Sequence, residues 1–367
     1  MRLASAWRSP WPIRILLCGV VAAALPYLAV PVYRFPPPAP FSGPALFNPY
    51  EGLRGPWSRA SLHAHSGLDA RQPDEDVVRA YRQMGYGVVA VAPHQRISAS
   101  GDLRVYEHGY GWFKQHQLVL GAQAVDWFEV PFWQGRNEKQ YVLNRLAGSA
   151  GLVAIAHPMD ESAYSVEDLG ALTNYALIEV MNGTTAHDVS WDAALSSGRP
   201  VWGIAVDDTH DVTDRASTRV AWTMVHAPGG VERVLDALAG GRSYGVAASG
   251  EADIALDTVT VRGQTLEVTA SGPATFRFVG TGGKTLKVVQ SAASASYDVP
   301  SSEPYVRTVI ETGGSRLYLN PVIRYDGTAL SVPQASVDAV WTFVRAGGLI
   351  SALVATCTAV FLKRKRK

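Results

Sequence analysis

Apolar residues in the central part of the chain fall into short runs separated by amphipathic stretches. The runs cover residues 60–65, 87–94, 118–125, 152–157, 176–182 and 201–207. Between them, apolar spacing predicts helices, most clearly at residues 73–84, where Pro73 precedes three acidic residues that suit the positive end of a helix dipole. Repeated strand–helix units of this length predict a parallel sheet, open or closed into a barrel, over residues 57–250.

The pattern changes on either side of this region. Residues 251–330 alternate polar and apolar positions in short segments separated by Gly and Ser turns, with no helical spacing between them. This is typical of a small all-β module. Residues 35–56 begin with the proline-rich sequence FPPPAPFSGP, which predicts a stiff, extended stalk that lifts the domain off a membrane.

Long apolar stretches lie near both ends of the chain. Residues 15–33 carry no charge and follow three arginines, whereas residues 346–362 carry none and lead into five consecutive basic residues. A bilayer core needs about 20 apolar residues, so we expect transmembrane helices within residues 1–34 and 338–367. The positive-inside rule then places both termini in the cytoplasm and the main domain outside, at the plasma or inner membrane. A cleaved signal peptide is the alternative for the first stretch.

Composition and charge exclude several classes of protein. Hydrophobic residues make up 47% of the chain, too many for a disordered protein. Lys and Arg number 33 against 32 Asp and Glu, and the only basic run is the C-terminal tail, so we expect no nucleic-acid partner. The two cysteines, Cys18 and Cys357, lie in the apolar ends and exclude a disulfide scaffold or a cysteine-rich metal module.

The histidines suggest the chemistry, because all nine lie between His63 and His226. Five of them stand at or just after the ends of predicted strands, together with two carboxylates: His63, His65, His94, His157, His210, Asp69 and Asp208. In α/β barrels these strand ends converge on one face, and imidazoles with carboxylates are the ligands of first-row metals. The sequence therefore predicts a metal site there. We expect structural roles for the other four: His108, His116, His187 and His226.

The same segments resemble, in order, the motifs of the PHP (polymerase and histidinol phosphatase) superfamily of metal-dependent phosphoesterases. They are SLHAHS at 61–66, APH at 92–94, AHP at 156–158 and DTH at 208–210, against the family's DLHxH(S/T), TDH, AHP and DxH. IEVMNG at 178–183, GGRSY at 240–244 and LNP at 319–321 further resemble the carbaryl-hydrolase-like branch. The resemblance covers roughly residues 57–325.

This resemblance implies a distorted (β/α)7 barrel, followed here by the small all-β module and flanked by the two transmembrane helices. It also implies one to three divalent metal ions, commonly zinc, manganese or iron. His63, His65 and Asp208 would hold the first metal and His157 the second, while Asp69, His94 and His210 would serve a third or complete the shell. His157 or His210 would protonate the leaving group. Arg96, two residues beyond His94, is the candidate for binding a phosphate.

One family motif is altered. The family's G-x-E, whose Glu bridges two metals, corresponds here to Gly121-Ala122-Gln123, and an amide is a neutral, weaker ligand. Four other carboxylates are candidates to take the place of the missing bridging Glu: Asp126, Glu129, Glu179 and Asp207.

Two functions follow from these motifs. The first is a membrane-anchored hydrolase that uses metal-activated water on a small-molecule ester or phosphoester. The alternative is a catalytically degenerate barrel that acts as an extracytoplasmic ligand- or partner-binding protein. The surviving ligand set favours the hydrolase, and Gln123 in place of the bridging Glu favours the binding protein.

Overall fold

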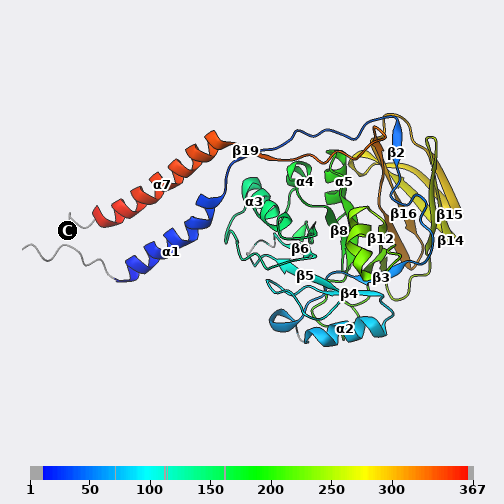
Figure 1. Ribbon diagram of the computed structural model, residues 1–367, viewed down its shortest axis with the longest axis horizontal. Helices are drawn as coiled ribbons and strands as arrows, with labels where there is room; N and C mark the ends of the chain where they lie inside the picture. Colours follow the sequence, from blue (N-terminus) through cyan, green and yellow to red (C-terminus); the bar gives the residue numbers. More distant parts are fainter. Residues whose placement is uncertain (1–10, 71, 111–112, 114, 161–162, 363–367) are drawn as a thin grey trace, which may run out of the picture.

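The protein has a mixed α/β fold built on one large mixed sheet (Figure 1). The computed structural model describes residues 11–70, 72–110, 113, 115–160 and 163–362. The helices of this part are α1 (Trp11–Ala29), α2 (Asp74–Gln83), α3 (Arg136–Ala147), α4 (Val166–Ala171), α5 (Asp188–Ser196), α6 (Val234–Ala239) and α7 (Ala339–Leu362). In α2, Val77 and Tyr81 are buried between charged residues, as the amphipathic pattern predicts.

A curved run of strands forms the centre of the domain. In order of pairing these are β3 (Ser58–Ser61), β4 (Val88–Val91), β5 (Leu103–His108), β6 (Gln117–Leu120), β7 (Leu152–Ile155), β8 (Leu177–Asn182) and β10 (Trp202–Val206). All residues of β4 and β10 are buried, as expected for apolar strands covered on both faces. The segments after β3 and β10 then meet, since His65 N–H donates to Thr209 O (2.8 Å) and Asp208 N–H to His63 O (3.1 Å).

The direction of β6 corrects the prediction of a parallel sheet. Strands β3, β4 and β5 run parallel to one another, and so do β7, β8 and β10, but β6 is antiparallel to both β5 and β7. Gln117 at the start of β6 therefore pairs with His108 and Ile155, the last residues of its neighbours. As a result, the beginning of β6 lies at the edge where β5 and β7 end, and its own end lies at the opposite edge.

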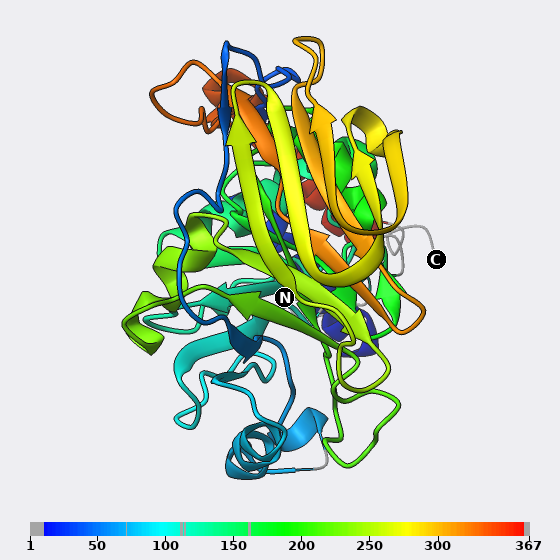
Figure 2. The same ribbon diagram turned by 90° about the vertical axis from the view of Figure 1, so that its right-hand side faces the viewer.

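The β-strands between residues 256 and 325 continue the same sheet. They are β13 (Leu256–Arg262), β14 (Thr265–Val279), β15 (Thr285–Asp298), β16 (Tyr305–Glu311), β17 (Ser315–Leu319) and β18 (Val322–Tyr325), and Figure 2 shows their broad antiparallel face. The link is β12 (Ser243–Ala248), which pairs with β17 on one side and with β11 (Ala221–Val225) on the other. Strand β11 in turn pairs with β3. The all-β region thus shares hydrogen-bonded strands with the part that carries the histidines.

The proline-rich segment does not stand away from the domain. Ala39 N–H donates to Ser197 O (3.2 Å), Arg199 donates to Pro36 O (3.2 Å), and Phe35 and Phe41 pack on the main apolar core. It leads into β2 (Ala45–Phe47), which pairs with β18. Residues 35–47 therefore run along the domain surface (Figure 1), because their aromatic side chains are partly buried against the core, and do not form the predicted free stalk.

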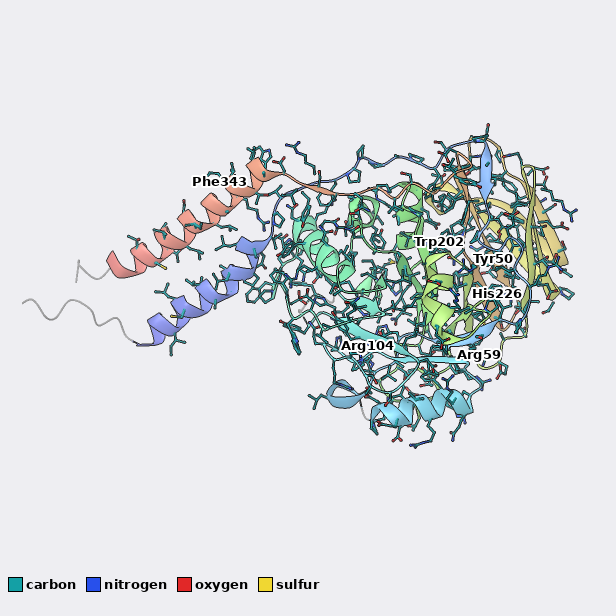
Figure 3. The ribbon with its side chains drawn as sticks, viewed as in Figure 1. Tyr50, Arg59, Arg104, Trp202, His226 and Phe343 are labelled. Carbon is teal, nitrogen blue, oxygen red and sulfur yellow. The ribbon has the colours of Figure 1, made fainter. Side chains whose placement is uncertain are left out.

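The two apolar helices leave the domain side by side (Figure 1). Strand β1 (Tyr33–Arg34), just after α1, pairs with β19 (Ser336–Val337), just before α7. Residues Ala339–Thr358 of α7 are long and apolar enough to span a membrane, whereas the apolar stretch Ile15–Ala29 of α1 is shorter. Phe343, labelled in Figure 3, is 81% exposed on α7.

Candidate metal centre

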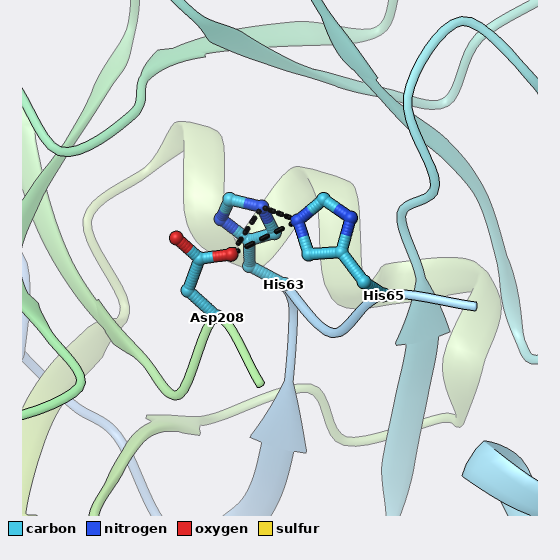
Figure 4. Close-up of side chains that lie close together, drawn as sticks. All are labelled: His63, His65 and Asp208. Atoms are coloured by element: carbon cyan, nitrogen blue, oxygen red, sulfur yellow. Dashed lines mark hydrogen bonds and ion pairs between the residues drawn. The ribbon is translucent and has the colours of Figure 1, made fainter. Parts of the chain in front are cut away.

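Three predicted ligands lie around one point after β3 and β10 (Figure 4). His65 Nε2 is 2.9 Å and His63 Nε2 is 3.1 Å from Asp208 Oδ1, and the two imidazole nitrogens are 3.1 Å apart. Ligands of a cation bound at about 2.1 Å are about 3.0 Å apart in an octahedral shell and about 3.4 Å apart in a tetrahedral one. The spacing of these atoms therefore fits a metal ion.

Glu107, the next-to-last residue of β5, joins this group to a second one. Its Oε2 lies 3.2 Å from His65 Nε2, 3.4 Å from His63 Nε2 and 3.1 Å from His94 Nε2. Its Oε1 lies 2.9 Å from both His116 Nδ1 and His157 Nε2. Each oxygen of one buried carboxylate thus faces its own set of imidazoles, which is the arrangement of a ligand that bridges two metals.

Glu107 and His116 are the residues that sequence reasoning missed. Gln123, expected at the bridging position, lies beyond the other end of β6, where its side chain is exposed and its backbone pairs with Ser149 and Arg104. His116, expected to be structural, stands just before β6 and so reaches the cluster. Both differences have one cause, which is that β6 runs antiparallel to its neighbours.

Glu179 of β8 holds two of these histidines in place. Its Oε1 lies 2.8 Å from His63 Nδ1, so that His63 presents Nε2 to the cluster. Its Oε2 accepts the His157 backbone N–H (2.8 Å) and an N–H of Asn182 (2.8 Å), whose amide also donates to Asp208 Oδ2 (3.0 Å). Such outer contacts fix the tautomer and orientation of metal-ligating imidazoles.

The backbone is strained at two of the candidate ligands. His157 has φ of 25° and Asp208 has φ of 52°, in the left-handed region that residues with a Cβ rarely adopt. Such conformations persist where surrounding contacts hold them, and they are common at functional sites. Here the holding contacts are the backbone hydrogen bonds from His157 to Glu179 and from Asp208 to His63.

His210 lies at the surface end of the cluster. Its ring stacks on His65 with centroids 4.0 Å apart, and its Nδ1 is 3.1 Å from Asp208 O. It lines a pocket of about 630 Å³ with Leu68, Ala70, Asp208, Asp211, Asp214 and Ser217. His210 and Asp208 therefore connect the buried imidazoles to a space where a small substrate would fit.

The remaining predicted residues have different environments. The imidazole of His94 is 28% exposed beside Glu107. Asp69 belongs to the 3-10 turn η1 (Gly67–Asp69), and its side chain lies outside the described part of the structure. The Arg96 guanidinium makes two hydrogen bonds to Asp74 (2.6 and 2.8 Å) and one to Ser66 (3.0 Å), so its predicted role in phosphate binding would require it to share or leave this ion pair.

Electrostatics make the cluster a strong acceptor of positive charge. Burial by itself lowers the pKa of His63, but the charges of Asp208, Glu107 and Glu179 outweigh it and raise that pKa to about 10. For His157, Glu107 likewise outweighs burial and raises the pKa to about 9. Burial favours a neutral Glu107, yet His63 and His116 hold the pKa of its carboxyl well below the usual range. A metal cation would replace these protons on the imidazoles.

The other three histidines lie outside these groups. His226, which is labelled in Figure 3, donates from Nε2 to Arg54 O (2.9 Å). His108 Nε2 donates to Phe128 O (2.9 Å). His187 is fully buried, and neither of its ring nitrogens has a hydrogen-bond partner in the described part of the chain.

No protein-family model matches this chain, and a search of characterised proteins also finds no match. The function is therefore inferred from the geometry of the site.

Proposed function

We propose that the protein is a membrane-anchored, metal-dependent hydrolase of phosphoesters or related esters, of the PHP superfamily type. The observation that carries the proposal is Glu107, whose two oxygens face separate sets of imidazoles at 2.9–3.4 Å. It supplies the bridging carboxylate that Gln123 does not. The degenerate-barrel alternative depended on a missing bridge, and it loses its main support.

Two ligand sets follow from these contacts. His63, His65 and Asp208 would hold one cation with Glu107 Oε2 beside them, and Glu107, His116 and His157 would hold a second. His65, His94 and Glu107 form a further group that could hold an ion, and His210 stacks on His65 beside the first set. Imidazole and carboxylate ligands without thiolates suit zinc, manganese or iron. When bound, these cations supply Lewis-acid chemistry, which lowers the pKa of water and polarises the ester.

The protein's own residues would position and protonate the substrate. Of the two histidines expected to protonate the leaving group, His210 is the one that lines the pocket, whereas His157 faces Glu107 in the interior. With Nδ1 of His210 placed on Asp208 O (3.1 Å), Nε2 is the nitrogen that would hold or release a proton. Glu179 and Asn182 keep the buried ligands oriented while this happens.

The fold and the ends of the chain support the rest of the proposal. The run from β3 to β10, whose two ends meet at the Ala64–Thr209 bridge, is what a distorted seven-stranded barrel requires. The far ends of α1 and α7 both point away from the domain. In the sequence, basic residues adjoin both helices on the side of the nearer terminus. This supports an anchor at both ends, an extracytoplasmic domain and cytoplasmic termini.

The sharpest test of the ligand sets compares two substitutions on the full-length protein in detergent. Glu107→Gln should reduce bound metal from two or more equivalents to one or fewer and abolish hydrolysis of a chromogenic phosphodiester, because an amide cannot neutralise two cations. Gln123→Glu is the matched control, and it should change neither quantity because residue 123 lies at the opposite edge of the sheet. Metal content is measured by mass spectrometry. Full metal content in Glu107→Gln would refute the bridging role.

A further inference from the structure

A cluster of large aromatic side chains is exposed on the segment formed by residues 127–133. The exposed fractions are 67% for Trp127, 49% for Phe132 and 69% for Trp133, and Tyr110, whose N–H donates to Glu129 Oε2 (3.3 Å), is 56% exposed. We call residues 127–133 the aromatic segment. Large exposed apolar patches are uncommon on soluble proteins and mark sites that contact a partner or a membrane.

One end of the aromatic segment contacts the apolar helix α1. Tyr27, two residues before the last residue of α1, donates from Oη to Trp133 O (3.0 Å). Val32 N–H donates to Thr342 Oγ1 (2.9 Å), which places the start of α7 beside the end of α1. Trp341, at the start of α7, is 61% exposed. Trp and Tyr are enriched where helices leave a bilayer, so these residues form an aromatic belt at the domain end of both helices.

The other end of the aromatic segment is attached to the candidate metal centre. His108, which follows Glu107, donates from Nε2 to Phe128 O (2.9 Å). Its Nδ1 lies 2.8 Å from Oε1 of Gln117, which follows His116. The aromatic segment thus links the backbone next to two candidate metal ligands with the helix that would enter the membrane. The pocket beside His210 also has an apolar edge, because Leu68 on its wall is fully exposed.

We propose that the aromatic segment inserts into the interfacial layer of the bilayer, and that the ester cleaved at the metal centre belongs to an amphiphile embedded in that same bilayer. The first part depends only on the surface. The second depends on the proposed hydrolase function and narrows its substrate from small-molecule esters in general to lipid-like ones. A segment so placed would hold the backbone next to Glu107 and His116 close to the surface of the bilayer.

The position of the segment can be tested without activity. The full-length protein, with Cys18→Ala and Cys357→Ala, receives Phe132→Cys and a polarity-sensitive fluorophore, and is placed in phosphatidylcholine–phosphatidylglycerol nanodiscs. Lipids brominated near the head of the acyl chain should quench this label, and aqueous iodide should not. Val288→Cys is the matched control, because Val288 is 47% exposed on β15 at the opposite end of the domain from the helices (Figure 1). Equal iodide quenching at both positions would refute the insertion.

The substrate class is tested with two chromogenic phosphodiesters, one with a long acyl chain in the nanodiscs and one short and soluble. The ratio of their kcat/KM values should be at least about tenfold in favour of the embedded ester, since binding energy from remote parts of a substrate raises this constant. Replacing Trp127, Phe132 and Trp133 with Ser should bring the ratio towards one, whereas Val288→Ser should preserve it.

The possible failures are distinguishable. A ratio near one in the native protein would refute the lipid-like substrate and leave the hydrolase intact. Hydrolysis of neither ester by the metal-loaded protein would contradict the proposed function, and the quenching result would still decide where the aromatic segment lies.

Discussion

At the scale of single residues, the candidate site is organised by a carboxylate inside a strand. Glu107 is 1% exposed and has five imidazole nitrogens within 3.4 Å. A buried carboxylate is costly unless it is paired, so these partners are needed for its charge to be tolerated. These imidazoles divide between the two oxygens of Glu107. Removal of one imidazole should therefore weaken one ligand set and spare the other.

His116 provides the test of that division. His116→Ala should lower bound metal by about one equivalent and reduce hydrolysis, because it removes one of three ligands of the second set. His226→Ala is the control, since the His226 side chain bonds only to the Arg54 backbone among the hydrogen bonds of the described residues. Both variants are measured by metal analysis and phosphodiester hydrolysis after their thermal unfolding has been compared with that of the native protein. Equal metal content in the two variants would show that His116 is structural.

The sequence could predict some of these residues for a clear physical reason. His63, His65 and Asp208 follow strands that run in the common direction, so the rule for parallel strand ends places them correctly. Glu107 and His116 stand on either side of a reversal, and a local pattern does not encode strand direction. One clue existed, because the eight residues from 109 to 116 are too few for the crossover that a parallel connection needs. This clue depends on predicting β5 as a strand, which is difficult because Arg104 and Glu107 interrupt its apolar run.

At the scale of elements, the start of α2 braces two ligand-bearing segments. The Asp74 carboxylate, in the first turn of the helix, accepts from Ser66 Oγ (2.5 Å), from Ser98 Oγ (2.6 Å) and from the Arg96 guanidinium. Ser66 follows His65, and Arg96 is two residues beyond His94. Arg96, together with the two serines, holds the pKa of Asp74 well below its usual range. Burial acts in the opposite direction and is outweighed. The helix start itself was predictable, because Pro73 and the acidic residues act locally.

Asp74→Asn should destabilise the protein in a pH-dependent way. At pH 7 the free energy of unfolding should fall by about 1–3 kcal/mol, the range for losing hydrogen bonds to a charged group. Because the pKa of Asp74 is lower folded than unfolded, its contribution is complete above pH of about 4 and is lost as the pH falls through the folded value. The difference between native and variant should therefore shrink in acid, as followed by unfolding in detergent.

The control for this experiment is Asp76→Asn. The Asp76 side chain is 43% exposed and pairs with Arg79 on the same helix, so its loss should cost little at any pH. A destabilisation by Asp74→Asn that stayed constant from pH 7 to acid would show that packing, and not the charge of the carboxylate, is what matters at this position.

At the scale of the whole molecule, the two terminal helices are tied to each other and to the domain. Arg34 pairs with Asp338 (2.7 Å), and Arg345 donates to Val30 O (2.9 Å) and pairs with Glu138 at the start of α3. The β1–β19 pair, which contains Arg34, adds backbone pairing next to these contacts. The hydropathy pattern alone predicts two separate apolar ends. Their association requires residues about 300 apart in sequence to meet, which only the folded chain determines.

This arrangement leads to a prediction about topology. In the background with Cys18→Ala and Cys357→Ala, Val288→Cys should react with a membrane-impermeant maleimide in intact spheroplasts of the expression host. A cysteine added after Lys367 should react only after lysis, because the basic residues that follow α7 favour the cytoplasmic side. Reaction of the C-terminal cysteine in intact spheroplasts, with Val288→Cys protected, would reverse the orientation. It would place the metal centre in the cytoplasm, where nucleic acids are available, and the near-zero net charge would then be the remaining argument against a nucleic-acid substrate.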